Sequence, residues 1–258
     1  MTIPIEQHNI EIHSNAQRWR RKLSLRRSYD DFYREIAGYL TPVEPGRTLE
    51  LGSGLCAIKK VIPACVTSDL FDNPLVDRRE NAYRLGFDDG ALDNVVMFDV
   101  FHHLRFPGAA LKEVARVLRA GGRLALFEPG LGLLGRLVYG LFHKEPLGLG
   151  DPILWDAPSG FNADEDTYYA AQGNAFRIFA GGECADRLGE WKVVAVKRKS
   201  AIAYVATGGF TGPQLYPSFA YPALHKLERL LDWLPGIFCA RMLVVLEKRE
   251  PGKSGPSN

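Results

Sequence analysis

Apolar positions along the chain follow two periodicities, the first of which is helical and occupies the opening segment. Tyr29, Phe32, Tyr33, Ile36 and Leu40 recur at the spacing of one helix face, and a Thr-Pro pair at 41–42 ends the pattern. Six basic residues crowd positions 18–27, which is typical of a solvated helix face and, as an alternative, of a patch that recognises an anion. We therefore expect residues 1–40 to form a helical cap.

Short apolar runs separated by turns predict strands from residue 47 onward. The runs lie at 47–51, 64–68, 94–98 and 123–127, and that at 94–98 is continuous, as expected for a strand buried on both faces of a parallel sheet. Between the last two, residues 107–118 place four apolar side chains at i, i+3, i+4 and i+7, which predicts an amphipathic helix. Alternation of this kind indicates βαβ units and an α/β fold.

After residue 130 the alternation stops and returns only near the carboxyl end. Residues 131–142 are apolar nearly all round, and residues 143–174 are rich in Pro, Gly and Asp, so we expect 131–184 to be an inserted lid over an acceptor. Residues 191–197 and 242–247 resume as strands, with a helix at 224–233 between them. The sequence thus predicts one domain with a core of 41–130 and 185–248 and a flexible tail at 249–258.

Composition narrows the class of protein. The 258 residues are 46% hydrophobic and 24% charged, and the net charge is +2, which gives no general reason to expect a nucleic-acid partner. The four cysteines are far apart and include no CxxC pair, so neither a metal site nor a disulfide framework is expected. The opening residues lack a secretory apolar segment and no run approaches the ~20 apolar residues of a membrane span. The sequence therefore predicts a cytoplasmic protein.

The most specific local feature is the segment Glu50-Leu51-Gly52-Ser53-Gly54, where the first predicted strand ends. Glycines let a ligand approach the backbone, and amide N–H groups beyond a strand attract anionic groups. With Ala57 the segment also satisfies the G-x-G-x-x-A fingerprint of a dinucleotide fold, which would indicate a nicotinamide-dependent oxidoreductase. Glu50 argues against that alternative, because a carboxylate at this position suits a ligand that carries an ammonium group.

At this point the chain resembles the class I S-adenosylmethionine (SAM) dependent methyltransferases, whose first motif is an acidic residue, any residue, then G-x-G. The resemblance covers residues 47–129 and is closest to the small-molecule, "type 11" branch. The further matches, in chain order, are Asp69 at the end of the second strand and the segments 81–87 (NAYRLGF), 88–93 (DDGALD), 100–104 (VFHHL) and 113–124 (EVARVLRAGGRL).

The resemblance implies a Rossmann-like fold with a mostly parallel seven-stranded sheet, and SAM as cofactor. The residues that it assigns to the cofactor are Glu50, Gly52, Ser53 and Gly54 at the methionine end, Asp69 and Leu70 at the ribose, Asn81 and Ala82 beside the adenine, and Phe98 and Asp99 bordering the methyl-transfer site. The chain departs from the family pattern at Cys56, which replaces a third glycine, and at Asn81, which replaces an aspartate. Its first two crossovers are also short.

The implied activity is methyl transfer to a small-molecule acceptor, an O- or N-nucleophile on a hydrophobic or anionic metabolite. A hydroxyl acceptor needs a general base, for which His103 and His143 are the candidates, although both also suit ordinary packing roles. A non-catalytic SAM-fold subunit or binding module is the alternative of a different class. The apolar run at 131–142 and the helix at 224–233 fit an acceptor pocket, the core or a homodimer face, and contact with a membrane surface is a weaker alternative.

Overall fold

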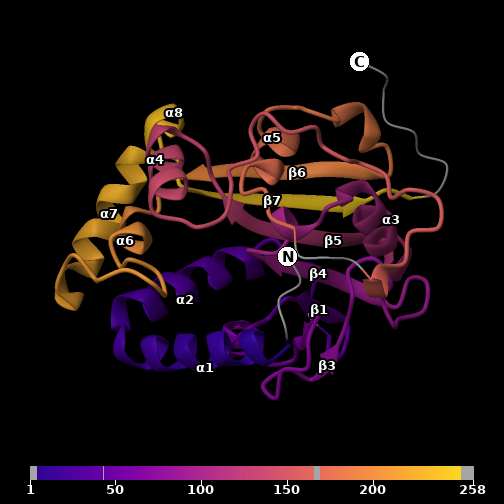
Figure 1. The fold of residues 1–258 in the computed structure, drawn as a ribbon, viewed down its shortest axis with the longest axis horizontal. Helices are drawn as coiled ribbons and strands as arrows, with labels where there is room; N and C mark the ends of the chain where they lie inside the picture. The colour runs from indigo at the N-terminus through magenta and orange to yellow at the C-terminus, as the bar shows by residue number, and fades with distance from the viewer. Residues whose placement is uncertain (1–4, 43, 166–168, 251–258) are drawn as a thin grey trace.

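A seven-stranded sheet organises the chain in the computed structural model, which describes residues 5–42, 44–165 and 169–250 (Figure 1). Its strand order is β3-β2-β1-β4-β5-β7-β6. The strands are β1 Thr48–Leu51, β2 Val66–Asp69, β3 Arg78–Arg79, β4 Leu92–Phe98, β5 Leu118–Pro129, β6 Trp191–Lys199 and β7 Arg241–Lys248. Strands β1 to β5 pair in parallel, whereas β7 runs antiparallel to both β5 and β6. The predicted mostly parallel, seven-stranded α/β fold is confirmed.

The register brings the carboxyl ends of the central strands to one edge of the sheet. Glu50 on β1 lies opposite Val96 on β4 and Thr67 on β2, and Phe98 on β4 lies opposite Phe127 on β5. In an open parallel sheet this edge, where the strand order reverses, is where ligands bind. Glu50, Asp69 and Asp99 therefore share one edge, although each comes from a different segment of the sequence.

Helices cover both faces of the sheet, and β4 contributes to both cores. Val95 and Met97 pack in a cluster with α3 (Pro107–Val117) and α5 (Asn174–Phe179), while Val96 and Phe98 pack in a second cluster with α2 (Leu23–Ala37). Side chains alternate across a strand, so an uninterrupted apolar run supplies both layers. The helix α1 (Ile5–Arg21) precedes α2 and packs against it (Figure 1).

The first crossovers are short, as the sequence predicts. Between β1 and β2 the only helical element is η1, a 3-10 turn at Ala57–Lys60, and residues 70–91 contain no helix. The helix α2 packs against η1, with Ile36 and Ile58 in the same buried cluster. The amino-terminal segment thus covers a face that a longer first crossover helix would otherwise occupy.

The remaining short elements lie after β4, in or next to the 131–184 segment, and between β6 and β7. The helices are α4 Leu133–Leu141, α6 Ile202–Val205, α7 Tyr221–Leu231 and α8 Pro235–Phe238, and the 3-10 turns are η2 Phe101–His103, η3 Ala163–Glu165, η4 Ala185–Arg187 and η5 Ser218–Ala220. Within the described ranges, no helix combines the length and the apolar character needed to cross a membrane. The predicted tail at 249–258 lies outside the described residues except for Arg249 and Glu250.

Candidate functional site

The bend after β1 has a backbone that only glycine accommodates at its first position. Gly52 is exposed and has φ 67°, and a Cβ built on it would lie 2.3 Å from Cγ2 of Val100. Gly54 also has positive φ, but space around it is open. The Ser53 N–H donates to the Ser68 carbonyl at 2.8 Å and its hydroxyl donates to the Glu50 carbonyl at 3.2 Å, so the bend is tied to β2.

Glu50 is a fully buried carboxylate with one satisfied oxygen. The Tyr33 hydroxyl donates to Oε1 at 2.7 Å, whereas Oε2 is buried and has no hydrogen-bond partner in the described part of the chain. Burial raises the pKa of Glu50 to about 7, against the opposing effect of the Tyr33 hydrogen bond. Burying an acceptor atom without a hydrogen-bond partner costs free energy. A cationic donor that bound Oε2 of Glu50 would remove this cost.

Asp69 lies at the end of β2, where its carboxylate is joined to the glycine bend by Asn73. Asp69 accepts from the Leu70 N–H at 2.8 Å and from Nδ2 of Asn73 at 3.3 Å, and the same Nδ2 donates to the Gly54 carbonyl at 2.9 Å. Asn73 was not among the predicted site residues, because its only signal in the sequence is its place in the loop four residues after Asp69. The Cys56 thiol donates to the Leu75 carbonyl at 3.1 Å and is therefore directed to this loop rather than to the bend.

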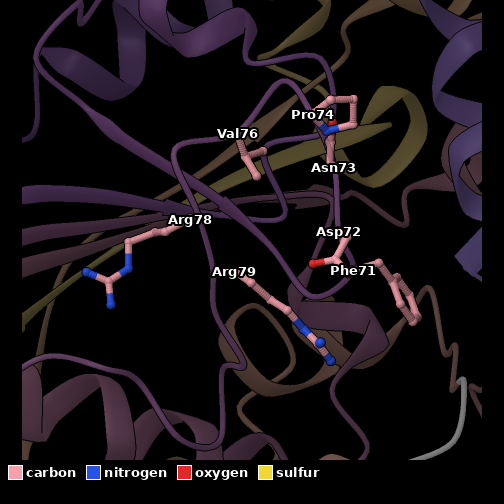
Figure 2. Close-up of a pocket in the computed structure, with 7 residues that line it drawn as sticks. All are labelled: Phe71, Asp72, Asn73, Pro74, Val76, Arg78 and Arg79. Carbon is pink, nitrogen blue, oxygen red and sulfur yellow. The ribbon is translucent and has the colours of Figure 1, made fainter.

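A cavity of about 460 Å³ opens beside the loop that follows Asp69 (Figure 2). Its lining residues are Phe71, Asp72, Asn73, Pro74, Val76, Arg78 and Arg79. Leu70 is 42% exposed next to it, and Nε of Arg79 donates to the Leu70 carbonyl at 2.7 Å. The cavity thus continues the sheet edge outward from the predicted ribose position.

Asn81 connects this half of the edge to the inserted segment. Its Nδ2 donates to the Ala163 carbonyl at 2.9 Å, and its Oδ1 accepts from the Tyr83 N–H at 3.0 Å. Asn81 and Ala82 are both half-buried. The Asn81 side chain therefore already contacts the segment at 131–184.

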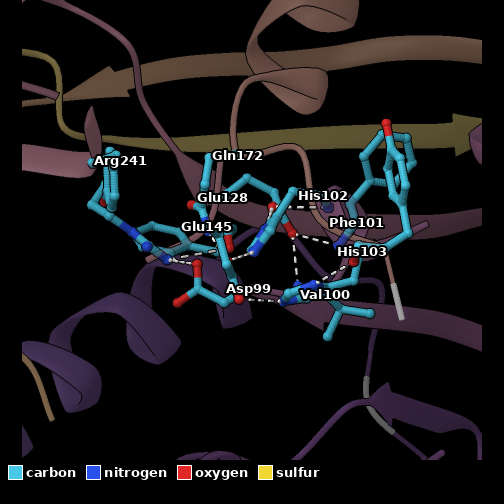
Figure 3. A network of polar contacts seen from close by, with 12 residues as sticks. Asp99, Val100, Phe101, His102, His103, Glu128, Glu145, Gln172 and Arg241 are labelled. Atoms are coloured by element: carbon cyan, nitrogen blue, oxygen red, sulfur yellow. Dashed lines mark hydrogen bonds and ion pairs between the residues drawn. The ribbon is translucent and has the colours of Figure 1, made fainter. Parts of the chain in front are cut away.

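At the end of β4, Asp99 is paired with a buried arginine from β7. Asp99 has φ 56°, a left-handed conformation that costs energy in a residue other than glycine. Nη2 of Arg241 lies 2.7 Å from Oδ1 of Asp99 (Figure 3). The Arg241 guanidinium lies 4.8 Å from the Phe127 ring centroid and 5.2 Å from that of Phe98. Burial alone would lower the pKa of the Arg241 guanidinium. The neighbouring Asp99 carboxylate has the larger effect and raises the pKa of Arg241 well above its usual value. The only sequence signal for Arg241 was a cation beside an apolar strand.

Glu128 on β5 fixes the segment that follows Asp99. Its Oε1 accepts from the N–H groups of Val100 at 3.0 Å and Phe101 at 2.7 Å, and its Oε2 lies 2.6 Å from Nδ1 of His102 (Figure 3). Burial would lower the pKa of His102, but Glu128 outweighs it, with a further contribution from Glu145, and raises that pKa to about 10. The same imidazolium lowers the pKa of Glu128 despite its burial. The pair is therefore ionised.

Both candidate bases face one carboxylate, that of Glu145. Nε2 of His103 lies 3.9 Å from Oε1 of Glu145, and Nε2 of His102 lies 3.7 Å from its Oε2 (Figure 3). Nδ1 of His143 also lies 3.7 Å from Oε2 of Glu145. Nδ1 of His103 is 3.0 Å from the Tyr169 carbonyl, to which it donates. Burial and the neighbouring imidazolium lower the pKa of His103 to about 4, so its ring is neutral at pH 7. Glu145 was not among the sequence candidates, although it lies two residues after His143.

Two groups of ligand atoms in the described residues are close enough to suit a metal ion. His102, His103 and Glu145 form one group and Asp99, His102 and Glu128 the other, with all atoms of each within 4.8 Å of one another. Both groups include His102, whose two ring nitrogens face carboxylates and hold protons at neutral pH. The arrangement therefore suits an ion-pair network better than a metal centre.

Comparisons with known proteins agree with this architecture. Residues 57–126 match the family model of a methyltransferase domain. A Thermotoga maritima SAM-dependent methyltransferase is 15% identical and superposes with a TM-score of 0.52, covering 91% of this chain and 94% of that chain. Geranyl diphosphate C-methyltransferase from Streptomyces coelicolor, in a structure with S-adenosyl-L-homocysteine, is 12% identical with a TM-score of 0.50, covering 85% and 76%. A search of curated proteins found no match.

The class that these observations define is the Rossmann-like α/β methyltransferase fold, with its strand order and its acidic residues at the carboxyl edge. Residues 57–126 thus match a methyltransferase domain, and the chain shares the fold of the two SAM-dependent methyltransferase structures above. The resemblance drawn from the motifs agrees with this domain match and with the shared fold.

Proposed function

We propose that the chain binds SAM at the carboxyl edge of β1, β2 and β4 and transfers its methyl group to a small-molecule acceptor. The observation that carries this proposal is Glu50, because its buried Oε2 without a described partner, beside an exposed glycine bend, suits the ammonium group of an amino-acid moiety. The residues therefore fit the methionine end of SAM. When bound, SAM supplies a methyl group already activated on a sulfonium.

The other cofactor positions follow along the same edge. Asp69 and Leu70 would hold the ribose, and Asn81 and Ala82 would border the adenine, with the inserted segment at 131–184 covering the site through the Asn81–Ala163 contact. Tyr33 from α2 orients Glu50 and supports the idea that residues 1–40 act as a cap. These side chains position the donor and exclude water, which can contribute roughly 7–11 kcal/mol to catalysis through alignment alone.

On the acceptor side, Phe98 and Asp99 border the transfer position, and His103 is the proposed base. Because Nδ1 of His103 donates to Tyr169, the proton-accepting nitrogen of the neutral ring is Nε2, which faces Glu145. His143 is the second candidate and is 44% exposed at the same carboxylate. We propose a hydrophobic or anionic acceptor with an O- or N-nucleophile, for which the Phe98 ring at the end of β4 would form an apolar border.

Calorimetric titration with SAM and S-adenosyl-L-homocysteine tests the proposal. We expect Glu50→Gln to weaken SAM binding at least about tenfold, which corresponds to about 1.4 kcal/mol. Glu190→Gln, at an exposed glutamate away from the edge, is the matched control and should not change the affinity. Absence of SAM binding at millimolar concentration, together with binding of NADH, would instead support the oxidoreductase alternative.

A non-catalytic SAM-fold subunit is the second candidate, and two observations favour it. The crossover helices are short or missing, and Asn73 joins the glycine bend to Asp69 across the edge. A subunit of this kind would bind SAM without turnover. Transfer of a labelled methyl group to small molecules extracted with the protein would exclude a non-catalytic subunit. Loss of this transfer in His103→Ala, but not in His143→Ala, would identify His103 as the general base.

A further inference from the structure

The helices α4, α7 and α8 form an exposed apolar surface that the cofactor site does not use. Figure 1 shows the three helices together at one end of the molecule, away from α1. Trp233 is 81% exposed, Phe142 77% and Leu141 70%. We call this surface the α4–α8 face and define it by Leu133, Leu137, Leu141, Phe142, Leu230, Trp233, Leu234 and Ile237, all of which are exposed.

Close packing of glycines fixes the two sides of this face relative to each other. The Gly132 N–H donates to the Cys239 carbonyl at 2.9 Å, and a Cβ on Gly135 would lie 1.8 Å from the Gly130 carbonyl oxygen and 2.6 Å from that of Cys239. Because α4 turns Gly135 inward against the end of α8, its leucines at 133, 137 and 141 point outward at a spacing of four. The sequence favoured a lid or core role for this run, whereas most of its large side chains are exposed.

The charges around the face have one sign. Within residues 133–144 and 221–238 the exposed charged side chains are Arg136, Lys144, Lys226 and Arg229. The two acidic residues of the second segment are turned inward, where Glu228 accepts from the Ala203 N–H and Asp232 accepts from the Ser200 N–H, both at 2.6 Å. An apolar face whose own two segments expose only cations suits a surface that is apolar inside and anionic outside.

We propose that the α4–α8 face docks the protein onto the surface of an anionic lipid bilayer. The helices have 9, 11 and 4 residues, so they are suited to lie in the interface with their apolar side chains among the lipid chains. Trp233 would lie at the level of the headgroups, where tryptophan is enriched. A second copy of the chain fits less well, because a symmetric contact would bring the same cations together. Docking of this kind is independent of SAM binding.

Vesicle flotation tests the docking. We expect the protein to float with vesicles of equal parts phosphatidylcholine and phosphatidylglycerol, to bind vesicles of phosphatidylcholine alone more weakly, and to lose part of its binding at ~1 M salt, where the screening length is about 3 Å. The fluorescence of Trp233 should shift to the blue on binding, and Trp233→Phe should abolish that shift while binding persists.

Two sets of variants separate the apolar and electrostatic contributions. The double variant Leu137→Glu/Trp233→Glu should weaken vesicle binding at least about tenfold. Lys226→Gln/Arg229→Gln should weaken binding to anionic vesicles about fivefold for each cation and leave binding to neutral vesicles unchanged. Ile10→Ser, at an apolar side chain of α1 that is 68% exposed, is the matched control and should bind like the wild type.

Three outcomes distinguish membrane docking from other occupants of the α4–α8 face. If wild-type protein stays below the vesicle fraction with both lipid mixtures, the face does not dock on membranes. If light scattering shows a dimer that Leu137→Glu/Trp233→Glu converts to a monomer, a second copy covers the face. Should the glutamate variant fail to fold by circular dichroism, Lys226→Gln/Arg229→Gln decides, because it changes only exposed side chains. SAM affinity measured in the same samples shows whether the cofactor site is intact.

Discussion

The two halves of the sheet edge treat their buried charges differently. On the β4–β5 side, the buried Glu128 is matched by two backbone N–H groups and the His102 imidazolium. Asp99, whose side chain is 31% exposed, forms an ion pair with Arg241, although its Oδ1 accepts no hydrogen bond of regular geometry. On the β1–β2 side, Oε1 of Glu50 accepts from Tyr33, but its Oε2 has no hydrogen-bond partner among the described residues, although Glu50 is as buried as Glu128. Buried polar groups are normally satisfied, so an exception requires an explanation. The comparison indicates that the β4–β5 side is preorganised, whereas the β1–β2 side is completed by a ligand.

The largest expected effect comes from removing the Glu128 carboxylate on the β4–β5 side. Glu128→Leu would leave the His102 imidazolium and the N–H groups of Val100 and Phe101 buried without their acceptor. We expect the free energy of unfolding to fall by about 3–5 kcal/mol. Urea denaturation measures this. Glu50→Leu is the matched control on the other side and should cost much less, so equal losses at the two positions would contradict the comparison.

The pH dependence of stability should distinguish Glu50 from an ordinary carboxylate. Its pKa is about 7 in the folded protein and near the ordinary 4.5 in the unfolded chain. Between these values the folded state holds a proton that the unfolded state has released, so the stabilisation present below pH 4.5 is lost as the pH rises to 7. The loss amounts to about 3 kcal/mol. Denaturation of the wild type and of Glu50→Gln across pH 4.5–8 measures it as the difference between the two curves. Parallel curves would show that Glu50 titrates normally.

Gly52 tests how closely the two sides are packed. Gly52→Ala would place a Cβ 2.3 Å from Cγ2 of Val100 and force alanine to adopt φ 67°, so we expect a loss of about 2 kcal/mol. Gly54→Ala also requires a positive φ, but the new Cβ would meet no other atom. We therefore expect it to lower the free energy of unfolding by only about 1 kcal/mol. Thermal unfolding compares the two. If Val100→Ala fails to restore part of the stability of Gly52→Ala, the steric explanation is wrong.

The smallest expected effect concerns Cys56, where the family has a third glycine. Cys56 has φ 55°, and Cys184 has φ 61° at the start of another 3-10 turn. Replacing either cysteine by glycine removes the strain of the left-handed backbone but increases the entropy of the unfolded chain. We therefore expect each replacement to raise the free energy of unfolding by about 0.5 kcal/mol. Only Cys56→Gly should also change SAM affinity, since Cys184 lies outside the proposed site. A change of affinity in both variants would indicate an indirect effect.

The sequence by itself determined the sheet and the places of its acidic residues. Short apolar runs between turns specified the central strands, and the motifs placed Glu50, Asp69 and Asp99 at strand ends. The carboxyl ends of parallel strands lie at one edge of the sheet, so these residues were expected together. The short crossovers were also predictable, since they follow from residue spacing alone.

Only the tertiary structure decided what each of these residues contacts. Tyr33 reaches Glu50 because α2 packs across the face that a short first crossover leaves open, and Arg241 reaches Asp99 because β7 is inserted next to β5. The exposure of α4 likewise depends on the glycines that pack it against α8. Local periodicity encodes which residues are apolar, but the partner of a buried charge and the side of a helix that remains exposed are set by segments distant in the sequence.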